Sequence, residues 1–206
     1  MGRKRKKSKN SFTRFVLSAL VLIFILGFGI AQINARRTAT SNNPELIAQA
    51  DQSAAREAFL QEIAPIAQEM RDAHGILPSI ILAQAALESD FGKSLLSARY
   101  NNLFGIKSFG HPQSVALNTQ EFLDGEWITY SGEFRVYNSF RESIEDHANL
   151  MVNGVTWNPA LYHGVITAQN YAEAAVALQE AGYATDPEYA NKLIAMVRQF
   201  NLTRFD

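Results

Sequence analysis

A single glutamate stands at the end of an apolar stretch and has the attributes of a general acid. Glu88 closes the run Ile80-Ile81-Leu82-Ala83-Gln84-Ala85-Ala86-Leu87-Glu88. On a helix, the positions three and four residues away hold Ala, Gln, Phe and Gly, so no Lys or Arg pairs with it locally. Burial of an unpaired carboxyl raises its pKa, and such a group holds a proton near neutral pH. The alternative is a carboxylate satisfied by backbone amides or by solvent at a helix end.

A second carboxylate lies on a predicted strand. The sequence between Val115 and Tyr137 alternates with period two around Asp124-Gly125, which predicts a hairpin of two or three strands. Glu121 falls on its first strand. Hydrolysis of a glycosidic bond needs a pair of carboxylates, and a helix-end acid facing a hairpin glutamate provides one. The alternative for Glu121 is a solvated carboxylate, since one face of such a strand often contacts water.

The loop after the acid helix and several aromatic residues are candidates for binding sugar. Asn101, Phe104 and Gly105 belong to the loop Asn101-Asn102-Leu103-Phe104-Gly105-Ile106-Lys107. Amides can hydrogen-bond N-acetyl groups and hydroxyls, while aromatic rings stack on sugar faces. A packed structural loop, with Phe104 and Ile106 in the core, is the alternative. Most aromatic side chains are buried, so only some of those in or beside the hairpin and loops should line a groove: Trp127, Tyr130, Tyr137, Trp157, Tyr162 and Tyr183.

Other catalytic chemistries have no support in the sequence. The four histidines show no metal-binding spacing, and the chain has no cysteine, so we expect no metal site. A phosphate-binding loop and a serine nucleophile elbow are also absent from the sequence. We therefore expect a hydrolase that works without a cofactor.

These residues must be positioned by helices interrupted by one hairpin. Helical periodicity runs from Ser53 to Ala73, where Pro65 suggests a break or a new first turn. Pro78 opens the helix that ends at Glu88, and Gly92 closes it. Ser139 and Glu142 form a capping box for a helix to about Val152. Two further helices are expected at about 170–181 and 186–200, with loops at 97–112 and 153–167. The predicted fold class is α+β.

The N-terminal segment predicts a membrane anchor. Seven Lys or Arg residues precede an apolar run from Phe15 to about Ile33, long enough to cross a bilayer as a helix. We divide the chain into a cytoplasmic basic tail (1–14), a single transmembrane span (15–35), an extracellular linker or stalk (36–52) and a folded domain (53–206). The charge preceding the span places the N-terminus in the cytoplasm and the domain outside the cell.

Cleavage of this segment is the alternative to a retained anchor. Gly29-Ile30-Ala31 and Ile33-Asn34-Ala35 both offer small residues to a signal peptidase, which would release a secreted protein. Retention is favoured because the apolar run is longer than the usual core of a secretory signal.

The charge of the exported part excludes one class of partner. From Thr38 onward the chain has ten Lys or Arg residues and all twenty of its acidic residues, so the formal net charge of this part is −10. An acidic domain lacks the basic face that nucleic acid requires. A neutral or locally recognised substrate is expected instead.

Five ordered blocks between about Ala58 and Asn201 resemble the bacterial endo-β-N-acetylglucosaminidases of glycoside hydrolase family 73. The blocks are Ala83-Gln84-Ala85-Ala86-Leu87-Glu88-Ser89-Asp90-Phe91-Gly92-Lys93-Ser94, Asn101-Asn102-Leu103-Phe104-Gly105-Ile106-Lys107, Thr119-Gln120-Glu121-Phe122, Phe134-Arg135-Val136-Tyr137-Asn138-Ser139 and Gly182-Tyr183-Ala184-Thr185-Asp186-Pro187-Glu188-Tyr189-Ala190. Phe91 stands where many relatives carry Trp, which leaves the position apolar.

The resemblance implies a lysozyme-like fold and hydrolysis of the glycan strands of peptidoglycan. It implies that Glu88 donates a proton to the leaving oxygen, that Glu121 is the second carboxylate and that Tyr183 assists. The substrate's own acetamido group could replace Glu121 in this role. A muramidase or lytic transglycosylase on the same fold, and a non-catalytic cell-wall binding module, remain as alternatives. The sequence gives no prediction of oligomeric state.

Overall fold

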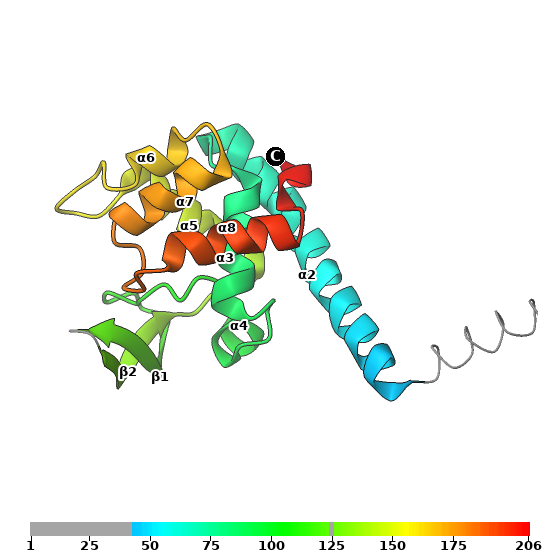
Figure 1. Ribbon diagram of the computed structural model, residues 1–206. Coiled ribbons are helices and arrows are strands. Elements are labelled where there is room, and N and C mark those ends of the chain that lie inside the picture. Colours follow the sequence, from blue (N-terminus) through cyan, green and yellow to red (C-terminus); the bar gives the residue numbers. More distant parts are fainter. Residues whose placement is uncertain (1–42, 124–125) are drawn as a thin grey trace, which may run out of the picture. The chain divides into compact units, whose positions relative to one another are not determined.

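The computed structural model describes residues 43–123 and 126–206 (Figure 1). The side chains of residues 119–128 and of Tyr130 lie outside this description. Residues 55–206 form one compact unit, and residues 43–54 belong to a second one. The predicted basic tail, membrane span and first part of the linker therefore lie outside the described residues. Within the described ranges, no helix combines the length and the apolar character needed to cross a bilayer.

Helices dominate the described chain, and one antiparallel hairpin is inserted between them, as predicted. In chain order the elements are α2 (Pro44–His74), α3 (Pro78–Ser89), α4 (Leu95–Tyr100), β1 (Ser114–Leu123), β2 (Glu126–Arg135), α5 (Phe140–Asn153), α6 (His163–Ile166), α7 (Tyr171–Glu180), α8 (Tyr189–Gln199) and the 3-10 helix η1 (Leu202–Phe205).

The helix that carries Glu88 lies at the centre of the fold. Every residue of α3 from Pro78 to Ala86 is buried. A helix that is apolar on all sides must be surrounded by other elements. α3 accordingly packs against α7, α8 and η1. Figure 1 shows α3 behind α8, with the hairpin at the lower left beyond the end of the helices. The acid is thus attached to the most enclosed element of the domain.

Two predictions for α2 were wrong. The helix begins at Pro44 and not at the expected Ser53, so residues 44–52 of the predicted linker are helical. Asn43 caps it, because its Oδ1 accepts the Glu45 N–H at 3.0 Å. Pro44 occupies the first helical position, which suits proline. The small polar residues before it led to the prediction of a linker at this point.

The expected break at Pro65 does not occur, and α2 continues through it. Pro65 itself is exposed, whereas its neighbours Ile63, Ala64 and Ala67 are buried. The backbone carbonyl that loses its N–H partner at a proline can be hydrated on the solvent side. Burial of the opposite face supplies the free energy that holds the helix together.

The hairpin is confirmed as two-stranded. β1 and β2 pair antiparallel over their full length, with Leu123 opposite Glu126 and Ser114 opposite Arg135. The residues between Leu123 and Glu126 are the predicted turn residues Asp124 and Gly125, which lie outside the described residues. Glu121 pairs with Ile128 in this register, so the backbone of the candidate second carboxylate lies near the tip of the hairpin.

The later helices are confirmed, while three short ones were missed. The Ser139 side chain accepts the Glu142 N–H, and the Glu142 carboxylate accepts the Asn138 N–H at 2.9 Å, one residue earlier than in a standard capping box. α4 and α6 fall partly or wholly inside the expected loops at 97–112 and 153–167, and η1 follows the last expected helix. Helices of four to six residues give too little periodicity to be recognised from sequence.

Candidate active site

The backbone after Glu88 turns sharply and fixes the end of α3. Asp90, Phe91 and Gly92 all have positive φ, of 48°, 54° and 77°. A side chain on Gly92 would place Cβ 2.9 Å from the ring of Phe59, so this position requires glycine. Ser89 Oγ donates to the Ala85 carbonyl at 2.5 Å and accepts the Gly92 N–H at 2.7 Å. The helix therefore ends at Ser89, one residue after the expected end at Glu88, and Gly92 belongs to the turn that closes it.

A tyrosine that the sequence analysis missed holds the Glu88 carboxyl. The Tyr189 hydroxyl donates to Glu88 Oε1 at 2.8 Å. Gln84, one turn before Glu88 on α3, donates from Nε2 to the same hydroxyl at 3.1 Å. Tyr189 is 2% exposed, and burial together with the nearby Glu88 charge raises its pKa well above the ordinary value. The hydroxyl keeps its proton at neutral pH and acts as a donor to the carboxyl.

The protein around Glu88 favours its protonated form. The side chain reaches solvent, yet protein encloses much of its surroundings and burial raises the pKa of Glu88. The Tyr189 hydrogen bond opposes this shift by stabilising the carboxylate. The Asp186 carboxylate raises the pKa of Glu88 further, and the Lys192 ammonium, ion-paired with Asp186, lowers it. A carboxyl that is accessible and reluctant to ionise is suited to deliver a proton.

The structure places Tyr183 close enough to Glu88 to be influenced by its charge. Its ring stacks on Tyr189 with centroids 5.8 Å apart, and its hydroxyl donates to the Phe104 carbonyl at 3.5 Å. Burial raises the pKa of Tyr183 well above its ordinary value, and the Glu88 charge raises it further. Tyr183 is therefore a neutral hydroxyl close to the acid.

Two other aromatic candidates adjoin Tyr183. The ring of Tyr162 meets that of Tyr183 edge to face at 6.1 Å, and both Tyr162 and Tyr137 are close enough to influence the pKa of Tyr183. Tyr162 is 6% exposed and Tyr137 is 8% exposed. The structure thus places both residues near Tyr183. Because both are buried, they expose little surface to a ligand.

The loop candidates are placed differently from one another. Asn101 Nδ2 donates to the Tyr137 carbonyl at 3.0 Å, and Asn101 ends α4 in the left-handed conformation. The Phe104 ring is buried and stacks on His147 at 4.0 Å, so it belongs to the core and presents its carbonyl to Tyr183. Gly105 has a φ of 66° with open space where a Cβ would be. For Phe104 this geometry supports the alternative interpretation, a packed structural loop.

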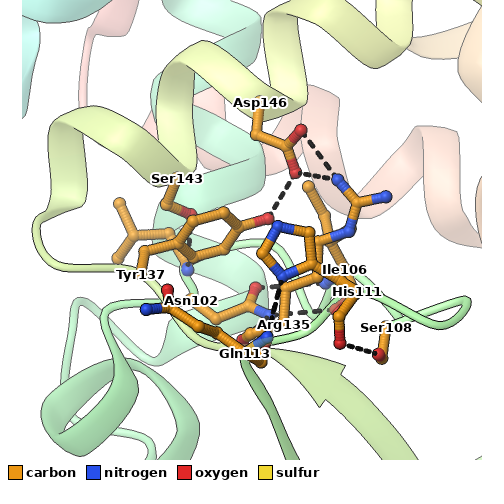
Figure 2. A network of polar contacts seen from close by, with 10 residues as sticks. Asn102, Ile106, Ser108, His111, Gln113, Arg135, Tyr137, Ser143 and Asp146 are labelled. Carbon is orange, nitrogen blue, oxygen red and sulfur yellow. Dashed lines mark hydrogen bonds and ion pairs between the residues drawn. The ribbon is translucent and has the colours of Figure 1, made fainter.

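The hairpin candidates can be placed only by their backbone. Glu121 lies on β1 and Trp127 on β2, and both side chains are outside the described part of the structure. The base of the hairpin is attached to α5 by a network of polar contacts (Figure 2). Arg135 Nη1 contacts Asp146 Oδ1 and Oδ2 at 2.8 and 2.7 Å, and the Tyr137 hydroxyl donates to Asp146 Oδ2 at 2.5 Å. Asp146 therefore connects the last residue of β2 to the helical core.

Asn102 fixes the same base from the loop side. Its Nδ2 donates to the carbonyls of Ile106 and Arg135 at 3.0 and 2.9 Å, and its Oδ1 accepts the Ile106 N–H at 3.1 Å. The side chain is 1% exposed, so these bonds replace all of its contact with water. The sequence showed an amide in this loop, but it did not indicate that the Asn102 side chain forms hydrogen bonds with backbone groups.

The residues missed from sequence act through long-range contacts. Tyr189 is 101 residues from Glu88 along the chain, and Gln84 is 105 residues from Tyr189. Both lie within the blocks that carry the family resemblance. An uncharged Gln at the centre of the apolar α3 was the available signal, because a buried amide requires a hydrogen-bonding partner.

Comparisons with known proteins relate this chain to glycoside hydrolases. The model of the glucosaminidase family, described as mannosyl-glycoprotein endo-beta-N-acetylglucosaminidase, matches residues 64–202. The exo-glucosaminidase LytG of Bacillus subtilis is 39% identical over the whole of this chain, which covers 70% of LytG. A probable N-acetylmuramidase of Lactococcus lactis is 43% identical over 73% of this chain, which spans only 35% of that protein.

Solved structures agree with the sequence comparisons. The catalytic domain of the autolysin Auto from Listeria monocytogenes has a TM-score of 0.66 at 34% identity, covering 80% of this chain and 98% of that domain. A structure titled N-acetylmuramoyl-L-alanine amidase from Staphylococcus aureus has a TM-score of 0.69 at 36% identity, covering 74% of this chain and 44% of that one. The family model matches more than half of the chain, and the chain belongs to the glucosaminidases of glycoside hydrolase family 73.

Proposed function

We propose that the protein is a peptidoglycan hydrolase that cleaves the β-1,4 bond after N-acetylglucosamine in glycan strands, with Glu88 as the general acid. The observation that carries the proposal is the Glu88 carboxyl itself, which is accessible to a ligand and has a raised pKa. Relatives named exo-glucosaminidase and autolysin support the substrate class. A lysozyme-like arrangement, with the acid on a central helix and the second carboxylate on a hairpin, agrees with the elements described above.

The hydrogen bonds to Glu88 determine which oxygen reacts. Oε1 accepts the Tyr189 hydroxyl, so the acid proton resides on Oε2. Oε2 donates this proton to the glycosidic oxygen as the bond to the anomeric carbon lengthens. Water then attacks the anomeric carbon, assisted by Glu121 or by the acetamido group of the substrate. Tyr183, a neutral hydroxyl beside the acid, assists in orienting the sugar.

Substitution of Glu88 tests the proposal. We expect Glu88→Gln in the full-length protein to reduce the rate of peptidoglycan cleavage by about a hundredfold or more, the usual contribution of general acid catalysis. Asp90→Asn is the matched control, since it removes an exposed carboxylate two residues away and Asn tolerates the left-handed conformation found there. A Glu88→Gln protein as active as the control would contradict the assignment.

The sugar found at the newly formed reducing ends distinguishes the proposed glucosaminidase reaction from a muramidase reaction. A relative named as a probable N-acetylmuramidase makes cleavage on the other side of the disaccharide the second candidate. Mass spectrometry of the digest should show reducing N-acetylglucosamine. Reducing N-acetylmuramic acid, or its anhydro form, would identify a muramidase or a lytic transglycosylase. Release of single terminal units rather than long fragments would indicate exo action, as in the name of LytG.

We further propose that residues 15–35 anchor the enzyme in the cell membrane, with the N-terminus in the cytoplasm and the folded domain outside. The support is the apolar run with seven cations before it. Protease added to intact wall-free cells should degrade the domain while the membrane fraction retains a short N-terminal fragment. Protein found in the medium without this segment would instead indicate cleavage.

A further inference from the structure

The loop before α6 presents one large aromatic ring to solvent. Trp157 is 81% exposed (its loop is drawn in yellow in Figure 1). Single exposed apolar residues are common on protein surfaces, so exposure alone assigns no function. Three further observations distinguish Trp157: a tight turn in its backbone, a segment without charge around it, and its closeness along the chain to residues of the candidate active site.

The backbone around Trp157 is a tight, closed turn. Val155 and Asn158 exchange both backbone hydrogen bonds, at 3.1 and 2.9 Å, so Thr156 and Trp157 form its tip. Gly154 precedes the turn with a φ of 61°, and a Cβ there would lie 2.4 Å from the Asn158 carbonyl oxygen. Only glycine permits this approach. The turn therefore defines the backbone at Trp157, and the side chain is exposed.

The segment that carries Trp157 contains no charged side chain. From Met151 to Asn170 the chain has no Asp, Glu, Lys or Arg, although these make up 19% of the whole sequence. Thr156 and Asn158, beside the ring, are exposed. Segments that bind the lipid surface combine aromatic residues with Lys and Arg, which are missing here. An aromatic ring flanked by a hydroxyl and an amide is suited to a neutral, hydroxyl-rich ligand.

The turn lies close along the chain to residues of the candidate active site. Tyr162 follows Trp157 by five residues, and its ring meets Tyr183 at 6.1 Å. Tyr183 stacks on Tyr189, which donates to Glu88. Five residues span at most roughly 18 Å, so the Cα of Trp157 lies within that distance of Tyr162. This limit keeps the ring within the reach of a polymer of several sugar units that starts at Glu88.

We propose that Trp157 is a distal sugar-binding subsite, where the indole stacks on a neutral hexose unit of a strand whose scissile bond lies at Glu88. Thr156 and Asn158 would hydrogen-bond the hydroxyl or acetamido groups of the same unit. The inference rests on the proposed function, because it takes the substrate to be a glycan polymer. It adds that Trp157 favours long strands over short fragments that end before reaching it.

The test compares long and short substrates in the full-length protein. For Trp157→Ala, we expect KM for peptide-free glycan strands to rise by about fivefold to tenfold, the factor that the loss of one aromatic stacking contact provides. The value of kcat, and the KM for a tetrasaccharide, should stay unchanged because the reacting groups are untouched. Trp157→Phe keeps an aromatic face and should restore most of the affinity. Thermal unfolding should not change, because the exposed ring adds little packing.

Phe109→Ala supplies the matched control, since Phe109 is an aromatic residue on a different loop and is 84% exposed. It should leave the KM for both substrates unchanged. An equal rise in KM for this control would show non-specific adsorption by exposed aromatics and overturn the subsite. An unchanged KM of Trp157→Ala on long strands would overturn it as well. Failure of the proposed function is a separate result, because it would appear as undiminished cleavage by Glu88→Gln in the same assay.

Discussion

At the scale of single residues, the reactivity of Glu88 depends on a balance between burial and one hydrogen bond. Burial raises the pKa of Glu88, and the Tyr189 hydroxyl lowers it by favouring the carboxylate. The same bond occupies Oε1 and thereby orients Oε2. Tyr189 is therefore expected to influence both the protonation of the acid and its direction.

Tyr189→Phe separates these contributions. Without the hydroxyl, the pKa of Glu88 rises further, so the loss of activity at high pH should begin at a higher pH than in the wild type. Poorer orientation should lower kcat by about tenfold. The measurement is a pH profile of kcat/KM on glycan strands.

Tyr171→Phe is the matched control, because the Tyr171 hydroxyl accepts a hydrogen bond from Arg198 Nε at 3.3 Å, a contact that links α7 to α8 and does not involve Glu88. Its pH profile should coincide with that of the wild type. If the profile of Tyr189→Phe coincides with it too, the hydrogen bond has no influence on the acid.

At the scale of secondary-structure elements, the hairpin depends on its attachment to α5. Asp146 accepts two hydrogen bonds from Arg135, the last residue of β2, and one from Tyr137, two residues further along the chain (Figure 2). A two-stranded sheet is marginal alone, so its placement comes from such contacts. The position of Glu121 relative to Glu88 should consequently depend on Asp146, although Asp146 belongs to neither strand.

Asp146→Ala should lower both stability and activity. Removing the carboxylate leaves Arg135 and Tyr137 without this partner, and we expect a loss of about 1–3 kcal/mol in the free energy of unfolding. The rate of glycan cleavage should fall by a larger factor than the small unfolded fraction accounts for. Urea unfolding and initial rates on the same samples provide the two values.

Glu145→Ala is the neighbouring control on α5. Its ion pair with Arg141, at 3.5 Å, is exposed on both sides and should contribute less than about 0.5 kcal/mol. A stable folded Asp146→Ala protein with the wild-type cleavage rate would show that the hairpin is positioned without this contact.

At the scale of the whole molecule, one buried histidine links stability to pH. His147 is 0% exposed, and neither ring nitrogen has a hydrogen-bond partner within the described ranges. Burial lowers the pKa of His147 from 6.5 to about 3. Between these values the unfolded chain binds more protons than the folded chain. The buried neutral His147 therefore costs no stability above pH 6.5, and the free energy of unfolding decreases as the pH falls toward 3.

His147→Phe should remove this dependence. The new ring can keep the stacking on Phe104, which has a centroid distance of 4.0 Å in the wild type. The wild type should lose roughly 1.4 kcal/mol per pH unit from this residue inside the window, and the variant should not. Urea unfolding at pH 7.5 and 4.5 measures the difference. The exposed His163→Phe serves as control, and equal slopes for all three proteins would contradict the account.

The sequence predicted the elements better than their exact extent. Period-two alternation and the Asp-Gly turn identified the hairpin, and the apolar run before Glu88 identified α3. Pro65 was misleading because a proline on the solvent face of a helix breaks one hydrogen bond without ending the helix. The short helices α4 and α6 gave no periodic signal.

The candidate site was predictable only in part, since residue types do not reveal contacts made across the chain. Glu88 was identified by the absence of local partners, and Tyr183 by the family resemblance. Tyr189 was overlooked, although it supplies the hydrogen bond to the acid. Phe104 was assigned to sugar binding, whereas its ring is in the core.

The position of Glu88 on the buried helix α3 has a practical consequence for engineering variants of this protein. Catalytic groups carried by surface loops can often be altered while the fold stays intact. Here the proposed acid projects from a helix whose first nine residues are buried, so changes that disturb the core should also displace Glu88. In directed evolution, selecting variants for lytic activity will therefore select for correct folding at the same time, without a separate screen for stability.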